Sequence, residues 1–383
     1  MSCVSEKSGE KGRCGMLRVA VIMGGQSAER EVSLRTGQTV VRELSRRFRV
    51  KPVQILASGW WVASPGYLHG NDTGDAQSWF TGEAKPLLRA LGELEDEGVE
   101  VAFNALHGPM GEDGTVQGLF RMVGIPLTGP DVIPAAVTMD KRLTKQVLLA
   151  GGVLTPRFFT LSVTALLDGT AEGLEILQRE ASRVPFPWIL KPNRLGSSVG
   201  VAIFQDIDDV RQGARDLVRA WPESALGDSV LVEEVVRGRE LTCGVIETDS
   251  SERTAGERGG ARALPPIEIR PRTSPFFDYH AKYVPGASEE ICPAPLSPHE
   301  TAQVQATALR VHGLLECAPL SRTDMFLTPE GRLQVLEVNT LPGMTATSLI
   351  PLSASKAGIL LGDLLGEIVE HALRRARLPA LVR

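Results

Sequence analysis

The chain has 383 residues, of which 43% are hydrophobic and 23% charged, and its formal net charge is −5 at pH 7. This acidic balance provides no positive field that would attract nucleic acid or an anionic membrane, so basic side chains are expected to act singly on small anions. The five cysteines include no CxxC pair, which argues against a disulfide framework or a zinc site and favours a reducing compartment. No apolar run reaches about 18 residues, so we expect no membrane span and predict a cytoplasmic protein.

The N-terminal segment differs in composition from the first structural unit, which follows it from about Leu17 to residue 130. Residues 1–16 are polar and charged and lack the apolar stretch of a signal peptide, so we expect a disordered leader, with Met16 as an alternative start. Apolar segments then alternate with helical ones, and LRVAVIM, VKPVQIL and VEVAFNALHG predict strands of an open α/β sheet. Ser27 is the predicted N-cap of the helix after the first strand, with Glu29 and Glu31 in its first turn, where the helix dipole favours anions.

Two further units follow along the chain. The second contains the predicted helix Asp140–Gly152 and the segment FPWILKPNRLGSSVGVAIF, which reads as a strand, a Gly/Ser loop and a strand. The third opens with SVLVEEVVRGRELTCGVI at Ser229. Residues 248–266 are poor in apolar side chains and predict a hydrated hairpin tip or loop. The capping box in LSPHE predicts a helix from Pro298 to about Leu315.

A predicted hairpin carries acidic side chains near its end. LSRTDMFLTPEGRLQVLEVN reads as two strands joined by a turn at TPEG. Residues two apart share a face of a strand, so Arg322 and Asp324 point one way, as do Glu337 and Asn339. With this turn we expect Arg322 near Glu337, and Asp324 diagonal to it. Close carboxylates repel unless a cation lies between them, and such oxygen ligands suit Mg²⁺; a hairpin with a hydrated face is the alternative.

Two glycine-rich loops could bind an anion or a small polar ligand. KPNRLGSSVG places Lys191 at a strand end before a turn of small residues, whose backbone N–H groups can approach phosphate. HGPMGEDGTVQG places His107 and two acidic residues among four glycines after a predicted strand, where open α/β sheets bind ligands. Each stretch alone could also be a simple connecting loop.

Two more stretches leave alternatives open. GGQSAERE lacks the third glycine of a dinucleotide fingerprint, and Glu29 at a helix start would repel a pyrophosphate. This glutamate suits an ammonium group, or it is simply a hydrated residue that favours the helix dipole. FFDYHAKY is rich in aromatic residues and could be a core strand, or a lid in which Lys282 reaches phosphate and Tyr283 closes over a substrate.

Taken together and in this order, HGxxGEDGxxQG, GSSVG, RTD and ExNTLPGMTxxS resemble the D-alanine–D-alanine ligases of the ATP-grasp superfamily. The resemblance extends from about Leu17 to the C-terminus. It implies an α/β, three-domain ATP-grasp fold: an N-terminal open parallel α/β sheet (17–130), a central α+β lid domain (131–228) and a C-terminal α+β domain with an antiparallel sheet (229–383). The implied reaction joins two molecules of D-alanine at the expense of ATP through an acyl phosphate, for peptidoglycan precursors. The implied cofactors are ATP and Mg²⁺, with Mn²⁺ as a substitute, and the implied assembly is a homodimer through the first domain, without nucleic acid or membrane.

The resemblance also implies roles for individual residues. The implied catalytic residues are Glu29, Ser197, Tyr283, Arg322 and Gly343. The implied substrate-binding residues are Glu29, His107, Arg322, Ser348 and Leu349. The implied ATP-binding residues are Lys141, Lys191, Ser197, Ser198, Glu233, Glu234, Val235, Val236, Glu240 and Lys282. The implied metal ligands are Asp324, Glu337 and Asn339.

Other functions remain as alternatives. D-alanine–D-lactate and D-alanine–D-serine ligases resemble this chain too, but those that use lactate often carry a His in the lid, so AKY with Tyr283 favours D-alanine as the second substrate. The chain departs from the family pattern in two places. It has His280 where the family often has an acidic residue, and it lacks the glycine that is common before RTD. Neither departure involves a residue with a proposed role in binding. A non-catalytic nucleotide sensor would be expected to lose Arg322, Asp324 or Glu337, and this chain retains all three. A Rossmann dehydrogenase is not supported, because the third glycine of the dinucleotide fingerprint is missing.

Overall fold

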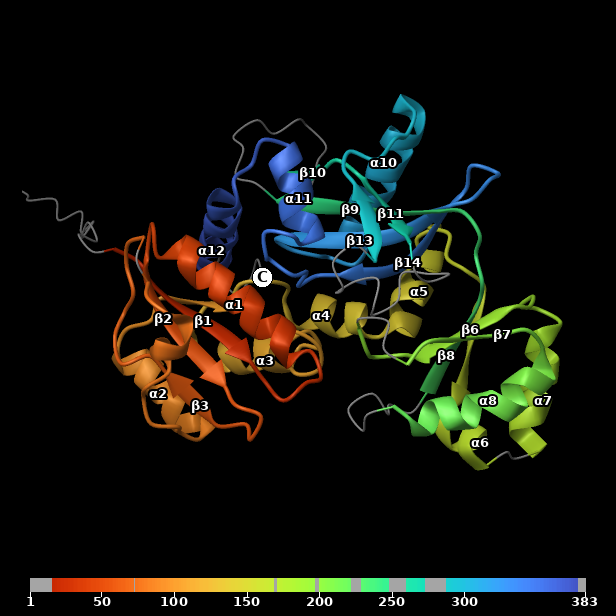
Figure 1. Ribbon diagram of the computed structural model, residues 1–383, viewed down its shortest axis with the longest axis horizontal. Coiled ribbons are helices and arrows are strands. Elements are labelled where there is room, and N and C mark those ends of the chain that lie inside the picture. Colours follow the sequence, from red (N-terminus) through yellow and green to blue (C-terminus); the bar gives the residue numbers. More distant parts are fainter. Residues whose placement is uncertain are drawn as a thin grey trace, which may run out of the picture.

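The structure is a computed structural model, and it describes residues 16–71, 73–168, 171–196, 200–221, 229–247, 260–272 and 287–377. In this part of the chain there are three β-sheets, each covered by helices, which surround a common centre (Figure 1). One sheet is mostly parallel and the other two are antiparallel. This mixed α/β architecture confirms the predicted fold class.

The first sheet is open and mostly parallel, and it lies at the lower left of Figure 1. Its strands in spatial order are β3 (Trp61–Ala63), β2 (Arg49–Ile55), β1 (Arg18–Gly24) and β4 (Val101–Asn104). The strands β2 and β4 run parallel to β1, whereas β3 is an antiparallel edge strand. The helices of this unit are α1 (Arg30–Leu44), the short 3-10 helix η1 (Ala76–Trp79), α2 (Leu87–Asp96) and α3 (Thr115–Met122).

The apolar run of β1 is explained by helices on both faces of this sheet. Val19, Val21 and Met23 pack into one core with α1, and Ala20 and Ile22 pack into a second core with α2 and α3. All five side chains are fully buried. A strand that is buried on both sides cannot alternate between polar and apolar residues, which is why its sequence is uniformly apolar.

The first core also takes in the C-terminal end of the chain. Helices α11 (Leu349–Lys356) and α12 (Leu361–Arg377) contribute side chains to it, and α12 packs against α1 and β4. Arg375 of α12 donates to the backbone carbonyls of Leu127 and Gly129, at 3.0 Å each. The C-terminal helices therefore join the first and third units. No single helix among the described residues is long and apolar enough to cross a membrane, although α11 and α12 together, bent by 108°, pass that test by length and composition.

One helix start differs from the prediction. Helix α1 begins at Arg30, with Glu29 at the N-cap position, so Ser27 is not the N-cap and only Glu31 lies in the first turn. Ser27 Oγ instead donates to the carbonyl of His107 (2.7 Å) and accepts from the backbone N–H of Glu29 (3.2 Å). The serine thus joins the loops after β1 and β4, and it holds Glu29 at the carboxyl edge of the sheet.

The second sheet, at the lower right of Figure 1, is antiparallel. Its strands in spatial order are β5 (Phe158–Ser162), β8 (Ser229–Glu234), β6 (Trp188–Pro192) and β7 (Ala202–Phe204). Helices α6 (Val163–Asp168), α7 (Ala171–Ala181) and α8 (Ile207–Arg219) accompany it, and α4 (Val132–Met139) and α5 (Lys141–Ala150) lead into it from the first unit. Because β8 pairs with β5 and β6, the chain passes to the third sheet after Glu234, a few residues later than the expected start at Ser229.

The third sheet, at the top of Figure 1, is also antiparallel. Its strands in spatial order are β12 (Ser288–Ile291), β11 (Ile267–Pro271), β9 (Arg239–Glu247), β13 (Leu320–Leu327) and β14 (Leu333–Asn339), with β10 (Ala261–Ala263) paired to β9. The predicted loop at 248–266 therefore ends in a strand, while its residues 248–259 lie outside the described part. Helix α10 (Pro298–Leu314) begins with both hydrogen bonds of the predicted capping box, between Ser297 and Glu300, which is confirmed.

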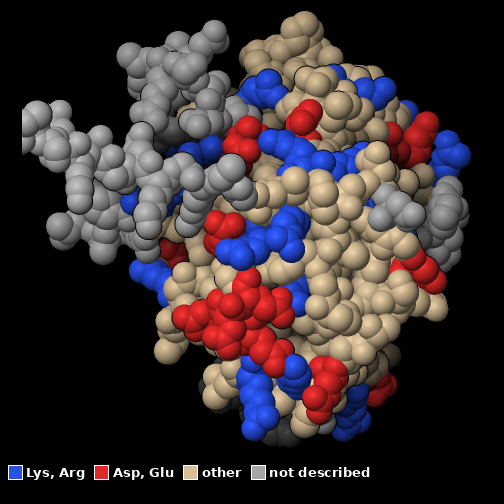
Figure 2. All heavy atoms as spheres, turned by 90° about the vertical axis from the view of Figure 1, so that its left-hand side faces the viewer, with Lys and Arg blue, Asp and Glu red and all other residues tan. Residues whose placement is uncertain are grey.

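The charged side chains on the outer face of the first unit are of both signs. Figure 2 shows a group of acidic side chains on this face, bordered by basic ones. This face of the molecule therefore presents a mixed charge rather than a uniform basic field.

Candidate active site

The centre of the site is the end of the β13–β14 hairpin. Arg322 lies opposite Asn339, and Asp324 lies opposite Glu337. The register shifts after Asp324, because Met325 is paired with Val335 and Leu336 is an extra residue on β14. The expected arrangement, with Arg322 near Glu337 and Asp324 diagonal to it, is therefore wrong: the bulge brings the two carboxylates directly opposite each other.

Arg322 and Asp324 form a bidentate ion pair along β13. The guanidinium Nε donates to Asp324 Oδ1 (2.9 Å) and its NH2 group donates to Oδ2 (2.7 Å). Thr242 Oγ1 on the neighbouring strand β9 donates to Oδ1 as well, at 2.6 Å. Because the side chains of Arg322 and Asp324 are only 15% and 12% exposed, these charge-assisted bonds hold both groups in a defined orientation.

Glu337 faces a cation from a different unit. Lys141 Nζ at the start of α5 lies 3.6 Å from Glu337 Oε2 and donates to the carbonyl of Leu195 (2.8 Å). Asp140 caps this helix by accepting from the Leu143 N–H. Burial alone would raise the pKa of the Asp140 carboxyl, but that N–H and the side chains of Asn193 and Arg194 hold it below its usual value. The cap thus fixes the point from which Lys141 reaches the hairpin.

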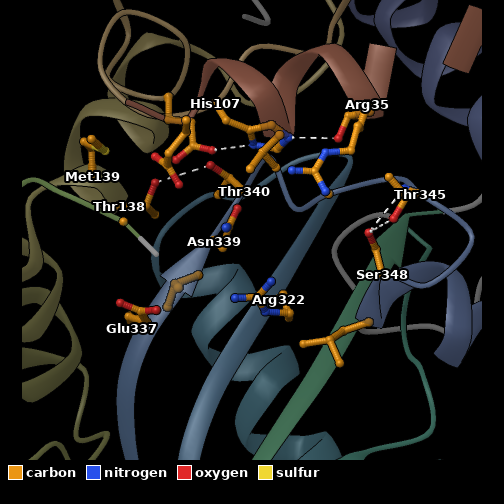
Figure 3. Close-up of a pocket in the computed structure, with 18 of the residues that line it drawn as sticks. Arg35, His107, Thr138, Met139, Arg322, Glu337, Asn339, Thr340, Thr345 and Ser348 are labelled. Carbon is orange, nitrogen blue, oxygen red and sulfur yellow. Dashed lines mark hydrogen bonds and ion pairs between the residues drawn. The ribbon is translucent and has the colours of Figure 1, made fainter. Parts of the chain in front are cut away.

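A first pocket of about 370 Å³ opens at the end of the hairpin, between the first and third units (Figure 3). His107 is 7% exposed and lies on its wall, with Nε2 3.1 Å from Thr36 Oγ1 and Nδ1 3.1 Å from Glu112 Oε1. Two hydrogen bonds on opposite ring nitrogens fix the plane of the imidazole. On the opposite wall Arg322, Glu337 and Asn339 extend from the strand ends toward the same space.

Glu29 enters this pocket between two glycine loops. A Cβ atom at Gly108 would lie 2.7 Å from Glu29 Oε2, and one at Gly196 would lie 3.2 Å from Oε1. Gly108 also has a positive φ of 73°, which favours glycine. The glycines of HGPMGEDG and of KPNRLGSS therefore make room for one carboxylate at the junction of the first and second units.

The far end of the first pocket is built around Ser348, the N-cap residue of α11. Its Oγ lies 2.8 Å from Thr345 Oγ1 and accepts from the Thr345 N–H (3.2 Å), and a Cβ atom at Gly343 would approach it to 3.0 Å. The Ser348 side chain forms no cap to the helix itself. Helix α11 starts at this end of the pocket, which Leu349 lines, and the free backbone N–H of a first helical residue suits a carboxylate.

A second pocket of about 780 Å³ lies between the second and third sheets. Its walls combine apolar residues, with Ile189, Val236 and Phe326 among them, and charged ones, as expected for a site that takes a flat ring next to charged groups. At its floor Glu233 is only 2% exposed and bridges Lys145 and Lys191, each at 2.6 Å. Burial would raise the pKa of Glu233, but the charges of the two lysines hold it below its usual value.

The two pockets meet at two side chains. Lys141 and Glu337 line both of them. A ligand in the second pocket can therefore place a charged group beside a ligand in the first, with an ammonium and a carboxylate at the junction. Transfer of a group from one ligand to the other requires this proximity.

All described residues to which the sequence resemblance gives a role in the site line one of the two pockets. The first pocket is lined by Glu29, His107, Lys141, Arg322, Glu337, Asn339, Gly343, Ser348 and Leu349. The second is lined by Lys141, Lys191, Glu233, Glu234, Val235, Val236, Glu240, Asp324 and Glu337. Ser197, Ser198, Lys282 and Tyr283 lie outside the described residues.

Several site residues were not found from the sequence. Arg35 and Thr36 line the first pocket from α1. Thr36 lies seven residues after Glu29, a helical spacing that could have found it, whereas Arg35 does not have this spacing. Glu112 belongs to a stretch that was singled out, but without a role. Glu290 of β12 also lines this pocket, and burial raises its pKa although the Arg322 charge opposes the shift. The sequence around Glu290 carries no signal for it.

The hairpin residues fit a hard divalent cation. Among the described residues no group of three or more His, Cys, Asp or Glu side chains is arranged to hold a metal. Asp324, Glu337 and Asn339 offer only oxygen donors, two of them charged, although Asn339 Oδ1 also accepts from the Leu341 N–H (2.9 Å). Mg²⁺ takes few protein ligands and completes its shell with phosphate oxygens and water, so this set suits it when a phosphate ligand is present.

A nucleotide-sized cleft between two antiparallel sheets, joined to a polar pocket on an open parallel sheet, defines an ATP-grasp ligase. The family model described as D-ala D-ala ligase N-terminus matches residues 18–130, and that described as D-ala D-ala ligase C-terminus matches residues 151–370. A D-alanine–D-alanine ligase of Methylobacterium radiotolerans is 38% identical over 362 residues, which cover 92% of this chain and 97% of that relative. The chain belongs to the D-alanine–D-alanine ligase family.

Solved structures agree with this assignment. A D-alanine–D-alanine ligase from Bacillus anthracis complexed with ATP is similar with a TM-score of 0.67 and 30% identity, covering 95% of this chain and 99% of that one. A D-Ala:D-Ser ligase from Enterococcus faecalis is similar with a TM-score of 0.75 and 28% identity, covering 94% and 100%.

Proposed function

We propose that the two pockets divide the reaction between them, with ATP in the second and two molecules of D-alanine in the first. As a member of its family the chain ligates two D-alanines at the expense of ATP, and the product serves peptidoglycan synthesis. The observation that carries the division is the shared lining by Lys141 and Glu337, because it lets the terminal phosphate of ATP reach a carboxylate in the first pocket.

The ATP assignment rests on the shape and charge of the second pocket. Its apolar walls suit the adenine ring, with the segment from Glu233 to Val236 along the ring edge and Glu240 at the ribose hydroxyls. Glu234 lies in this edge segment. Lys191 and Lys141 would bind the phosphates. Lys191 lines the second pocket beside Glu233, and Lys141 lines both pockets.

The metal assignment rests on the two opposed carboxylates. Asp324, Glu337 and Asn339 would hold Mg²⁺, or Mn²⁺ in its place, against phosphate oxygens of ATP. The ion would neutralise charge on the phosphates. Lys141 and Arg322 then supply the remaining positive charge from the protein, at the junction and on β13.

The first pocket has a place for each charged group of the substrates. Glu29 would bind the ammonium of the first D-alanine, and His107 would contact its carboxylate. Ser348 and the Leu349 N–H would bind the carboxylate of the second D-alanine. Arg322 and the Gly343 N–H would stabilise the transferring phosphoryl group and the oxyanion of the tetrahedral intermediate. Charge stabilisation of this kind is typically worth about 3–4 kcal/mol for a single donor.

The reaction balances in two steps. A carboxylate oxygen of the first D-alanine attacks the γ-phosphorus of ATP, and ADP leaves. The amine of the second D-alanine, after losing one proton, attacks the acyl carbon, and inorganic phosphate leaves with that carboxylate oxygen and with the second proton of the nitrogen. Exclusion of water between the units protects the acyl phosphate from hydrolysis.

Four further assignments rest on the sequence resemblance alone. Ser197 and Ser198 would contact the phosphates, and Lys282 would do so from a lid. Tyr283 and Ser197 would join Glu29 in a hydrogen-bonded group that closes the site. Tyr283 is the reason for proposing D-alanine, rather than D-lactate, as the second substrate.

The assembly and the location of the protein belong to the same proposal. We infer a homodimer through the first domain and a cytoplasmic location, where ATP and D-alanine are both present. Sedimentation of the purified chain and fractionation of cells that produce it would test the two statements.

Analysis of products with mixed acceptors tests the function. We expect phosphate release from Mg-ATP that requires D-alanine, and D-alanyl-D-alanine as the main product when equal D-alanine, D-serine and D-lactate are offered at neutral pH. If the folded protein makes mainly D-alanyl-D-serine or D-alanyl-D-lactate, the chain is one of the alternative ligases instead. A folded protein that releases no phosphate with any acceptor would overturn the proposal.

A further inference from the structure

Lys145 of α5 is a fully buried charged residue that lines neither pocket. Its side chain is 0% exposed, and its Nζ lies 2.6 Å from Glu233 Oε1. It also donates to Thr155 Oγ1, and it lies 5.6 Å from the centre of the Phe158 ring, a contact that favours a cation. The enclosure is complete, so Lys145 cannot contact a nucleotide in the second pocket directly.

Glu233 connects this buried lysine to one that does line the pocket. Glu233 Oε2 pairs with Lys191 Nζ at 2.6 Å, while its other oxygen pairs with Lys145. One carboxylate is thus shared between two ammonium groups, so the cluster has a net charge of +1. Since Glu233 is 2% exposed, water screens these charges little.

We propose that Lys145 is a positioning residue for ATP. Lys145 pairs with the Glu233 oxygen that faces away from Lys191, so that the positive charge of Lys191 remains available to the phosphates. Without Lys145 the cluster would consist of one carboxylate and one ammonium, with no net charge. Lys191 would then be drawn fully to Glu233. The inference rests on the proposed place of ATP in the second pocket, with Lys191 at the phosphates.

The state of Lys145 also couples the cluster to pH. Burial and the nearby charge of Lys191 lower the pKa of Lys145, the carboxylates of Glu233 and Glu337 oppose this, and the net result is a pKa of about 8. Lys145 is therefore an ammonium at neutral pH and loses its proton as the pH rises through about 8. The same loss of charge that a substitution causes can thus be produced in the unaltered protein.

The test compares ATP with adenosine, which lacks the phosphates, by calorimetric titration of the full chain. For Lys145→Met we expect the Kd of ATP to rise about tenfold or more, and the Kd of adenosine to change less than about threefold. The matched control is Lys51→Met, because Lys51 is equally enclosed (3% exposed) and paired with Glu97 at 2.5 Å, but in the first unit. Lys51→Met should leave both Kd values unchanged.

Other outcomes separate the inference from the proposed function. If Lys145→Met weakens ATP and adenosine equally, or neither, Lys145 has only a structural role and the inference is overturned. Lys191→Met tests the underlying site: if it leaves the Kd of ATP unchanged, the place of the phosphates is wrong.

A second measurement decides the matter should Lys145→Met fail to fold. In the unaltered protein the Kd of ATP should rise between about pH 7 and pH 9, while that of adenosine stays constant. Thr155→Val keeps the charge of Lys145 and should preserve the selective response to ATP. A constant ratio of the two Kd values across this pH range would contradict the inference.

Discussion

Asp324 and Glu337 lie directly opposite each other on β13 and β14, at the bulge where the register of the hairpin shifts. Two carboxylates in this position repel unless positive charge lies between or beside them. Arg322 pairs with Asp324, and Lys141 approaches Glu337 at 3.6 Å. The protein thus partly compensates each carboxylate from the side, at the place where Glu337 lines both pockets.

Replacing Glu337 tests the metal assignment. We expect Glu337→Gln to lower kcat about 100-fold or more and to raise the Mg²⁺ concentration needed for half-maximal activity, because a charged ligand becomes neutral while the side-chain volume stays the same. Steady-state rates over a Mg²⁺ series measure both effects. Glu330→Gln in the exposed turn of the same hairpin is the matched control and should behave as the unaltered protein. Normal Mg²⁺ dependence in Glu337→Gln would remove this residue from the metal site.

Replacing Glu29 tests the binding of the first ammonium group. We expect Glu29→Gln to raise the KM for D-alanine about 10- to 100-fold, the usual effect of losing a charged hydrogen-bond partner, with the Kd of ATP unchanged. Glu31→Gln in the first turn of the same helix removes one negative charge nearby and serves as the control. A change in the Kd of ATP without a change in the KM for D-alanine would show that Glu29 does not bind D-alanine, and would contradict the assignment.

Replacing Tyr283, which lies outside the described residues, tests its proposed role in closing the site. Tyr283→Phe removes only the hydroxyl group, so we expect a modest loss of kcat together with a larger share of D-lactate in the product when both acceptors compete. Tyr67→Phe in the first unit is the control for the loss of a tyrosine hydroxyl. If Tyr283→Phe altered neither the rate nor the product ratio, the lid role and the argument for D-alanine as acceptor would both be withdrawn.

A partly buried charged group outside the site predicts the acid stability of the protein. Glu247 Oε1 lies 3.4 Å from His312 Nε2, and Oε2 lies 2.9 Å from His371 Nε2. Burial would raise the pKa of Glu247, but hydrogen bonds to the two histidines outweigh this and lower it to about 2 from 4.5. A depressed pKa in the folded state stabilises the fold above pH 4.5, and this contribution is lost as the pH falls from there to about 2.

The corresponding variant is Glu247→Gln. At pH 7 it should be less stable than the unaltered protein by about 2 kcal/mol, and the difference should shrink toward pH 3, as measured by urea unfolding. Glu95→Gln on the exposed side of α2 should show no such convergence. A difference in stability that stays constant from pH 7 to pH 3 would contradict the role of the Glu247 charge.

The sequence predicted which residues line the two pockets better than it predicted how they are arranged. Alternation along β13 and β14 correctly assigned Arg322, Asp324, Glu337 and Asn339 to one end of a hairpin, because side-chain direction on a strand is a local property. The bulge at Leu336 was not predicted, since a single extra residue leaves no distinct pattern in the sequence. It changed which residues lie opposite each other.

Long-range packing accounts for the remaining differences. The contact of α12 with α1, and the burial of Lys145 behind Glu233, depend on segments that are far apart in the chain. Serine is a preferred N-cap residue, but the Ser27 hydroxyl donates to the carbonyl of His107 instead, and helix α1 starts at Arg30. In each case a tertiary contact outweighs a local preference.

The account depends most on direct transfer of phosphate from ATP to a D-alanine carboxylate at the junction of the pockets. The reaction with D-alanine that carries ¹⁸O in both carboxylate oxygens measures this transfer, with mass spectrometry of the released inorganic phosphate. The account predicts one ¹⁸O atom in each phosphate released during dipeptide synthesis. Phosphate that contains no ¹⁸O, while dipeptide is formed at the normal rate, would contradict it.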